Sequence, residues 1–394
     1  MGNGTLPIYQ EHPATVLGPA PRITSLLIKP ASALCNLDCS YCFYVDRDAD
    51  PYKSRSARLM SLETLERIVQ SYLCYSFPSS IFAFQGGEPT LAGLPFFEKL
   101  VELQQQHGRG GQTVSNALQT NGVLIDENWC SLFKQYNWLL GISVDGPEEI
   151  NDLYRFNKEG RGTWKRVIRS IETLQEHGIE FNCLCVLNQA NIEKPNEIYN
   201  FFQSLEVDNI QFIPLAEFDS NGNPLPFTIT PQQYGRFLCE IFELWWPHRR
   251  KVRIRFFDNT AEALAGMKPG TCTMHETCDS YVVVEYNGDI YPCDFFVENE
   301  WKLGNIMVDS WNEIAHRQRR HSFASKKSLA HPECQACEYK SICHGGCPKF
   351  RHGQHKRFDD LDYFCSSYKM IFAKCVGPLR EEVAKILGQQ ETGN

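Results

Sequence analysis

The chain has 394 residues, 42% hydrophobic and 22% charged, which is ordinary for a globular protein with a large core. Its net charge of −8 disfavours a nucleic-acid partner, because a polyanion binds best to an excess of positive charge. No apolar run approaches the roughly 20 residues of a membrane span, and residues 1–13 lack the basic and apolar regions of a secretory signal.

Seventeen cysteines are the outlying number in this composition. The count is odd, and the cysteines cluster at spacings typical of metal sites. Together with the lack of an export signal, this pattern predicts a cytoplasmic protein with no membrane partner, in which cysteines serve as metal ligands.

Residues 1–22 have no clear period and are expected to form a loose arm. From Ile23 onward, strand-like apolar runs alternate with helix-like segments. The expected strands are Ser25–Lys29, Ile81–Phe84, Ser115–Thr120, Leu139–Val144, Glu180–Leu187 and Ile210–Pro214. The expected helices are Ser61–Leu73, Leu94–His107, Asp126–Gln135, Thr163–His177 and Ile192–Ser204. This alternation predicts parallel strands with helices outside, as an open barrel or a doubly wound sheet.

Three cysteines follow the first expected strand in a short loop, namely Cys35, Cys39 and Cys42. Three thiolates can bind three irons of a [4Fe–4S] cluster and leave the fourth iron open to a small molecule. A zinc knuckle is the alternative, but the next cysteine, Cys74, is far along the chain. The spacing CxxxCxxC, with Tyr41 before the last cysteine, is identified as the signature of radical S-adenosylmethionine (SAM) enzymes.

Turn motifs follow the next three strands, at Gln85–Pro89, Gln119–Gly122 and Ser143–Pro147. In the first of them, two glycines permit close backbone approach to a ligand, and Glu88 can accept hydrogen bonds from an ammonium group. All three could be plain turns on composition alone. Their position at strand ends, where barrels gather their chemistry, favours a functional role.

The pattern changes near residue 250, where we place a domain boundary. A helix is expected at Pro231–Trp246, a short strand at Val252–Phe257, and a hairpin at Tyr281–Glu285 and Asp289–Tyr291. The expected domains are residues 23–250, residues 251–380 and a tail of residues 381–394, of which residues 388–394 are expected to be frayed.

Nine cysteines lie beyond residue 271, and eight of them suffice for two closed four-cysteine sites. Such sites fit auxiliary [4Fe–4S] clusters that transfer electrons, with two structural zinc ions as the alternative. Spacing alone does not say which cysteines share a site. The other six cysteines are expected to be small core side chains: Cys74, Cys130, Cys183, Cys185, Cys239 and Cys375.

Several stretches closely resemble the anaerobic sulfatase-maturating enzymes, a group of radical SAM proteins with a C-terminal SPASM extension. They are LLIKPASALCNLDCSYCFY, FAFQGGEPTLAG, ALQTNGVLID, GISVDGP and GDIYPCDFFV, followed by the final cysteine run. The resemblance implies an α/β fold: a partial (β/α)6 radical SAM barrel, then a cysteine-rich SPASM domain with a β-hairpin and two auxiliary clusters.

The implied activity is oxidation of a Cys or Ser in a C/S-x-P-x-R-like motif of a sulfatase to Cα-formylglycine. The implied cofactors are SAM and three [4Fe–4S] clusters, with a flavodoxin or ferredoxin as electron donor. The resemblance assigns one auxiliary cluster to Cys272, Cys278, Cys293 and Cys347. It assigns the other to Cys334, Cys337, Cys343 and Cys365, and makes these clusters the electron exit.

The resemblance also implies roles for other residues. Asp294, which follows Cys293, corresponds to the base, and Tyr44 and Gln85 correspond to substrate-pocket positions. The implied SAM contacts are Tyr41, Gly87, Ser143, Arg155 and, through its backbone, Ala216, with Glu88 added from the turn motif. Without the resemblance, Asp294 and Arg155 could be solvated, Tyr41 a packing residue and Ser143 a turn residue.

Two other functions compete. A different SPASM enzyme would form thioether or carbon–carbon crosslinks in a peptide with the same clusters, although no N-terminal peptide-recognition domain is visible in the sequence. A non-catalytic iron–sulfur electron-transfer protein would not cleave SAM, and the open three-cysteine site speaks against it.

Overall fold

The computed structural model describes residues 22–44, 51–52, 59–329, 331–355 and 357–391. The expected N-terminal arm lies outside the described residues except for Arg22. One ten-stranded sheet runs through the molecule in the order β10-β9-β8-β1-β2-β3-β4-β5-β6-β7. Within the described part of the chain, no helix has both the length and the apolar character to cross a membrane.

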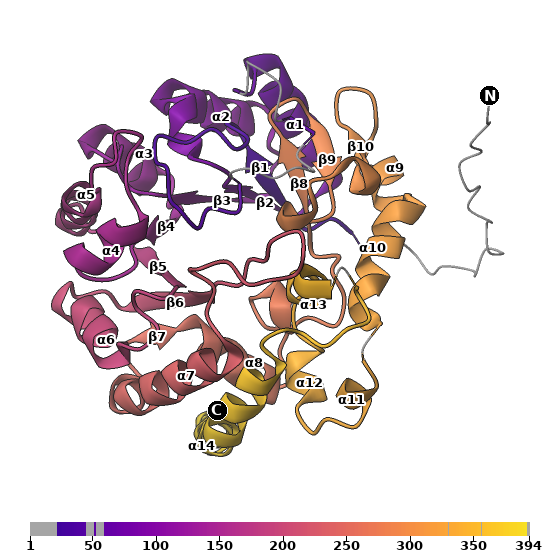
Figure 1. Cartoon of the computed structure of the whole chain (residues 1–394). Helices are drawn as coiled ribbons and strands as arrows, with labels where there is room; N and C mark the ends of the chain where they lie inside the picture. Colours follow the sequence, from indigo (N-terminus) through magenta and orange to yellow (C-terminus); the bar gives the residue numbers. More distant parts are fainter. Residues whose placement is uncertain (1–21, 45–50, 53–58, 330, 356, 392–394) are drawn as a thin grey trace, which may run out of the picture.

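Seven parallel strands form the barrel portion, and every strand predicted up to residue 214 is present within two residues of its expected ends. They are β1 Ser25–Lys29, β2 Ser79–Phe84, β3 Thr113–Thr120, β4 Leu139–Ser143, β5 Phe181–Leu187, β6 Asn209–Pro214 and β7 Arg253–Ile254. These strands alternate with helices on the outside of the curved sheet (Figure 1). The prediction of an α/β partial barrel is confirmed.

The helices of this portion have local sequence signals at their ends. They are α1 Leu62–Tyr75, α2 Leu94–His107, α3 Glu127–Gln135, α4 Glu148–Tyr154, α5 Trp164–Glu176, α6 Pro195–Ser204, α7 Pro231–Trp245 and α8 Arg255–Leu264. Ser61 caps α1 by accepting a hydrogen bond from the Thr64 amide at 3.1 Å. The predicted helices are confirmed, whereas the short α4 was not predicted.

The hairpin of the C-terminal part extends the barrel sheet instead of forming a sheet of its own. It consists of β8 Tyr281–Glu285 and β9 Asp289–Tyr291, as predicted, followed by β10 Gly304–Asn305. Strand β8 pairs parallel with β1, so that Lys29 lies opposite Glu285. This pairing makes the hairpin continuous with the barrel sheet, next to the strand that leads into the first cysteine loop.

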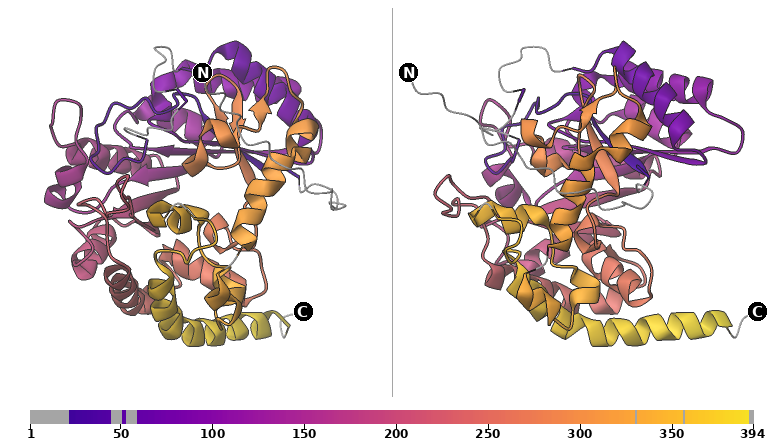
Figure 2. Two further views of the ribbon diagram at one scale, coloured as in Figure 1. Left: turned by 45° about the vertical axis from the view of Figure 1, so that its right-hand side comes forward. Right: turned by 90° about the vertical axis from the view of Figure 1, so that its right-hand side faces the viewer.

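Short helices and one long helix complete the C-terminal part. They are α9 Trp311–His316, α10 Gln318–Ser328, α11 Pro332–Gln335, α12 Lys340–Cys343, α13 Pro348–His355 and α14 Cys365–Glu391. Helices α10 to α13 lie between the two ends of the strand arc, whereas α14 packs beside α7 and α8 and its end projects beyond the body of the molecule (Figure 2).

Three predictions from the sequence are wrong. The expected strand Val252–Phe257 is cut to two residues, because residues 255–264 form α8, whose Phe256 stacks on Phe372 of α14. The expected fraying from residue 388 does not hold for residues 388–391, which continue α14. On α1, Cys74 is exposed, contrary to its prediction, whereas Cys239 packs half-buried against the core and the other four cysteines expected there are buried.

Candidate functional site

The cysteine loop that follows β1 is held from three sides by backbone hydrogen bonds. The Asp38 amide donates to the Phe156 carbonyl at 2.8 Å, and the Ser40 amide donates to the Tyr154 carbonyl at 3.0 Å. The Glu88 amide donates to the Leu34 carbonyl at 2.8 Å. The loop conformation therefore depends on segments after β2 and α4, as well as on its own sequence.

The thiols of this loop are close enough to interact electrostatically. Burial raises the pKa of Cys35 to about 11 and that of Cys39 to about 12, and in both cases the neighbouring Cys42 raises it further. The Arg155 charge acts in the opposite direction on both thiols. This donor set fits the three thiolate ligands of a [4Fe–4S] cluster, since binding to iron stabilises the ionised thiols.

Tyr41 lies at the centre of a buried polar group beside the cysteine loop. Its hydroxyl donates a hydrogen bond to Asp145, which follows β4, and accepts one from Arg155 Nη1 at 3.0 Å. Burial raises the pKa of Asp145, and the Arg155 charge opposes this rise. Arg155 is 5% exposed and is therefore not a solvated arginine. Sequence reasoning missed Asp145, although the predicted turn motif contains it.

The glycine motif after β2 packs against the cysteine loop. A side-chain carbon at Gly87 would lie 2.2 Å from the Leu34 carbonyl oxygen, so only glycine fits there. Glu88 is fully buried, and its carboxylate accepts hydrogen bonds from Thr90, from the Thr120 hydroxyl at 2.8 Å and from the Asn121 amide at 2.7 Å. The motif thus joins the turns after β2 and β3 to the cysteine loop. Contact of Gly87 or Glu88 with SAM stays a prediction.

The remaining predicted SAM contacts lie at the C-terminal ends of parallel strands. Ser143 ends β4, and its hydroxyl accepts a hydrogen bond from Gln119 Nε2 at 3.0 Å. Ala216 follows β6 and is buried.

Asp294 lies directly beside the predicted substrate-pocket residues, 250 positions from Tyr44. Tyr44 donates its hydroxyl hydrogen to Asp294 Oδ2, and Gln85 Nε2 approaches the same oxygen at 3.5 Å. Lys29 Nζ lies 3.4 Å from Asp294 Oδ1 and 2.7 Å from Glu285 Oε1. All three charged groups are buried. Asp294 is thus part of the site and not a surface acid; Lys29 and Glu285 were not predicted.

The first auxiliary set is brought together from distant segments. The Cys293 thiol interacts electrostatically with Cys347, Cys278 and Cys272, although burial is the main reason that its pKa is raised. The Tyr281 hydroxyl lies 3.5 Å from Cys293 Sγ. These four cysteines are the ones that the resemblance assigned to one cluster.

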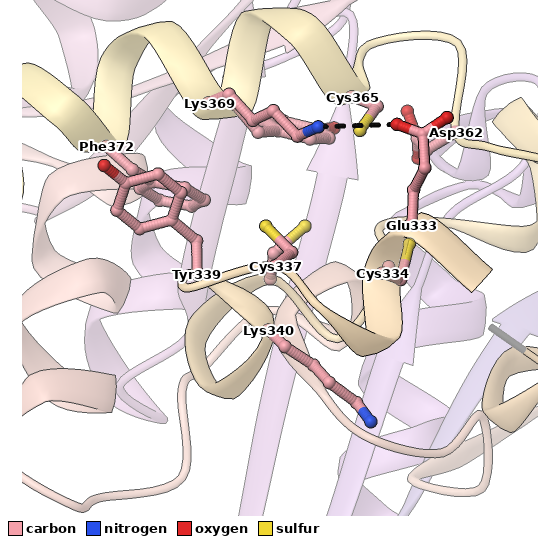
Figure 3. A pocket seen from close by; sticks show the side chains of 12 residues that line it. Glu333, Cys334, Cys337, Tyr339, Lys340, Asp362, Cys365, Lys369 and Phe372 are labelled. Carbon is pink, nitrogen blue, oxygen red and sulfur yellow. Dashed lines mark ion pairs between the residues drawn. The ribbon is translucent and has the colours of Figure 1, made fainter. Parts of the chain in front are cut away.

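The second auxiliary set lines a partly open pocket next to the start of α14. Its wall includes Cys334, Cys337, Cys343 and Cys365, together with Asp362 and the ion pair of Lys369 with Glu333 at 3.6 Å (Figure 3). In the described ranges, no three Cys, His, Asp or Glu side chains are grouped as around a single metal ion. Four thiols around one pocket are the donor set that a four-cysteine [4Fe–4S] cluster requires.

Comparisons with known proteins agree with this arrangement. The radical SAM superfamily model matches residues 30–202, and the SPASM model, an iron-sulfur cluster-binding domain, matches residues 272–338. A serine-type anaerobic sulfatase-maturating enzyme of Bacteroides thetaiotaomicron is 36% identical over 401 residues, which cover 97% of this chain and 96% of the relative. A cysteine-type anaerobic sulfatase-maturating enzyme of Clostridium perfringens is 39% identical over 355 residues, which cover 88% of this chain and 95% of the relative.

Solved structures show the same likeness. Native anSMEcpe with bound AdoMet and Cp18Cys peptide has a TM-score of 0.85 and 37% identity, covering 93% of this chain and all of that chain. The resemblance inferred from the motifs is thereby confirmed, and the chain belongs to the anaerobic sulfatase-maturating enzymes, a family of radical SAM oxidoreductases with a SPASM domain.

Proposed function

We propose that this protein oxidises a Cys or Ser side chain of a sulfatase polypeptide to Cα-formylglycine. The observation that carries the proposal is the contact of Asp294 with Tyr44 and Gln85, next to the three-cysteine loop. This contact joins an acid–base group to a radical-forming site in one buried region. Relatives named for both serine and cysteine targets match this chain, so both targets belong in the test.

The proposed cofactors are SAM and one [4Fe–4S] cluster at Cys35, Cys39 and Cys42, with two further clusters at the auxiliary sets. When bound, these groups supply the radical that takes a hydrogen atom from the target Cβ and accept the electron that the substrate then loses. The chain's own residues position the target and remove its proton.

In the proposed reaction, Asp294 takes the proton from the thiol or hydroxyl group of the target. At the same time, the Cβ radical of the target gives up one electron, for which the auxiliary clusters are the proposed acceptors. A serine target then becomes the aldehyde directly. A cysteine target becomes a thioaldehyde, which water hydrolyses to the aldehyde with release of hydrogen sulfide. The Tyr44 hydroxyl and the Lys29 ammonium hold the Asp294 carboxylate in place, which a general base requires.

The experiment is anaerobic incubation of reduced, cluster-loaded protein with SAM and sulfatase peptides that carry Cys or Ser. Mass spectrometry is expected to show loss of two hydrogens from the Ser peptide, or that loss plus exchange of sulfur for oxygen in the Cys peptide. A crosslinked peptide would instead indicate the other class of SPASM enzyme. Release of no deoxyadenosine would contradict radical SAM catalysis altogether.

The role of Asp294 has its own test. D294N should keep full iron content and SAM cleavage but lose aldehyde formation by about 100-fold or more, because general-base catalysis contributes on the order of 10²–10⁴. D279N is the matched control, since Asp279 also follows a ligand-set cysteine, Cys278. Equal aldehyde yields from D294N and D279N would reject Asp294 as the base.

A further inference from the structure

A lysine ammonium group is buried beside the first auxiliary cysteine set. Lys327, on α10, is 1% exposed. Its Nζ donates hydrogen bonds to the carbonyl oxygens of Cys272 at 2.8 Å and Thr273 at 2.9 Å. Burial of an ammonium is strongly unfavourable unless an opposite charge compensates it. The compensating charge must therefore lie close to this position.

Among the described residues, Lys327 makes no ion pair with a carboxylate. Besides Asp362, its attractive electrostatic partners are the thiols of Cys278, Cys347 and Cys272, in that order. All three belong to the first auxiliary set. Ionised cysteines at this site are thus the groups placed to compensate Lys327.

A second buried cation makes the excess of positive charge larger. Arg351, on α13, is 2% exposed, and its described hydrogen bonds all go to backbone carbonyls, including Gly345 at 2.8 Å and Lys327 at 2.9 Å. Asp362 is the buried acid that interacts with both cations. Two cations against one carboxylate leave one positive charge in the interior of a chain whose net charge is −8.

We infer that Lys327 is the counter-charge of the first auxiliary cluster and raises its reduction potential. The inference rests on the proposed cluster at Cys272, Cys278, Cys293 and Cys347. A positive charge beside a cluster stabilises the reduced form, which carries one more electron. Lys327 therefore favours transfer of one electron from the substrate radical to this cluster.

The test measures reduction potentials in full-length protein with Cys35, Cys39 and Cys42 replaced by Ala, so that only auxiliary clusters remain. In an EPR-monitored redox titration, K327M should shift the midpoint potential of one cluster to a more negative value and leave the other unchanged. K327R should retain the potential. K326M, the neighbouring lysine on the same helix, should shift neither potential.

Each result decides the matter. Unchanged potentials in a K327M protein with two intact clusters would overturn the inference but leave the proposed function standing. If the variant that lacks Cys35, Cys39 and Cys42 but keeps Lys327 contains no auxiliary clusters, the cluster assignment itself is overturned. If K327M lacks one cluster, its presence in K327R supports a need for the charge, and equal loss in both variants contradicts it.

Discussion

The hydroxyl group of Tyr41 joins the cysteine loop to Asp145 and Arg155, and two of these three residues, Tyr41 and Arg155, are predicted SAM contacts. It donates to Asp145 and accepts from Arg155, and all three side chains are buried. Asp145 also accepts a hydrogen bond from the Val186 amide at 3.0 Å, which ties the group to β5. Burial acts to lower the pKa of Arg155, but Tyr41, Cys39 and Asp145 each act to raise it, and the pKa lies well above its ordinary value.

This arrangement predicts that D145N is more destabilising than Y41F. Removing one partner of a buried charge group costs about 3 kcal/mol, because the other charge remains buried. Losing a hydroxyl that bridges them costs about 1–2 kcal/mol. Anaerobic denaturant unfolding of the two variants gives the comparison, and a D145N effect no larger than that of Y41F would contradict the charge argument.

At the scale of one element, the turn after β2 shapes the cysteine loop. G87A should lose about one third of the bound iron, because the loop must move away from the added methyl group while both auxiliary sites stay intact. G110A is the control, since nothing lies within 4 Å of a side-chain carbon at Gly110. Iron and sulfide analysis measures the effect, and equal iron content in both variants would refute the packing role.

The ionisation of Asp258, on helix α8, affects the stability of the folded protein. Burial raises the pKa of Asp258 to about 6, with Arg253 opposing and Glu262 adding to the rise. An unfolded aspartate ionises near pH 3.9, so the folded state loses stability as pH rises from there through about 6. D258N should therefore stabilise the protein at pH 8, by about 1–2 kcal/mol once the lost helix-dipole interaction is deducted.

The measurement is the thermal unfolding midpoint of D258N at pH 8 and pH 5, with a smaller gain expected at pH 5. E240Q, which removes an exposed carboxylate on α7, serves as the control and should change little. If the stability gain of D258N is larger at pH 5 than at pH 8, the predicted direction of the pH dependence is wrong.

The same helix shows why some elements could not be predicted. Val252, Ile254 and Phe256 alternate as in a strand, and this local period was the basis of the wrong prediction. The helix forms because Phe256 and Phe257 pack on partners from α14 and α7, over 100 residues away in the case of α14. The strands up to β6 could be predicted because their apolar runs are bounded by turns and need no such distant partner.

The residues of the candidate site also fall into those that could be predicted from the sequence and those that could not. Its cysteines could be found from spacing, because a cluster requires several thiols within a short loop. Lys29 and Glu285 could not, since nothing local indicates that β8 pairs with β1 and places them opposite each other. The same applies to Lys327, because its buried neighbours Cys272, Cys278 and Cys347 are distant from it in the sequence.

At the scale of the whole molecule, the C-terminal part completes the site that the barrel begins. Phe43, next to the last cysteine of the loop, packs on Phe295, next to Asp294, with ring centroids 4.8 Å apart. Lys349, after Cys347, lies 4.5 Å over the Phe295 ring and forms an ion pair with Glu217 of the segment after β6. The loop of Cys35, Cys39 and Cys42, the Asp294 segment and the first auxiliary set are therefore joined by direct side-chain contacts.

The sorting of eleven cysteines into sets of three, four and four underlies all of these assignments. Iron analysis with Mössbauer spectroscopy of anaerobically prepared protein tests it most directly. We expect about 12 irons per chain, about 8 after replacement of Cys35, Cys39 and Cys42 by Ala, and a spectral change on addition of SAM that this variant lacks. Bound zinc in place of iron, or a SAM response that survives the triple replacement, would contradict it.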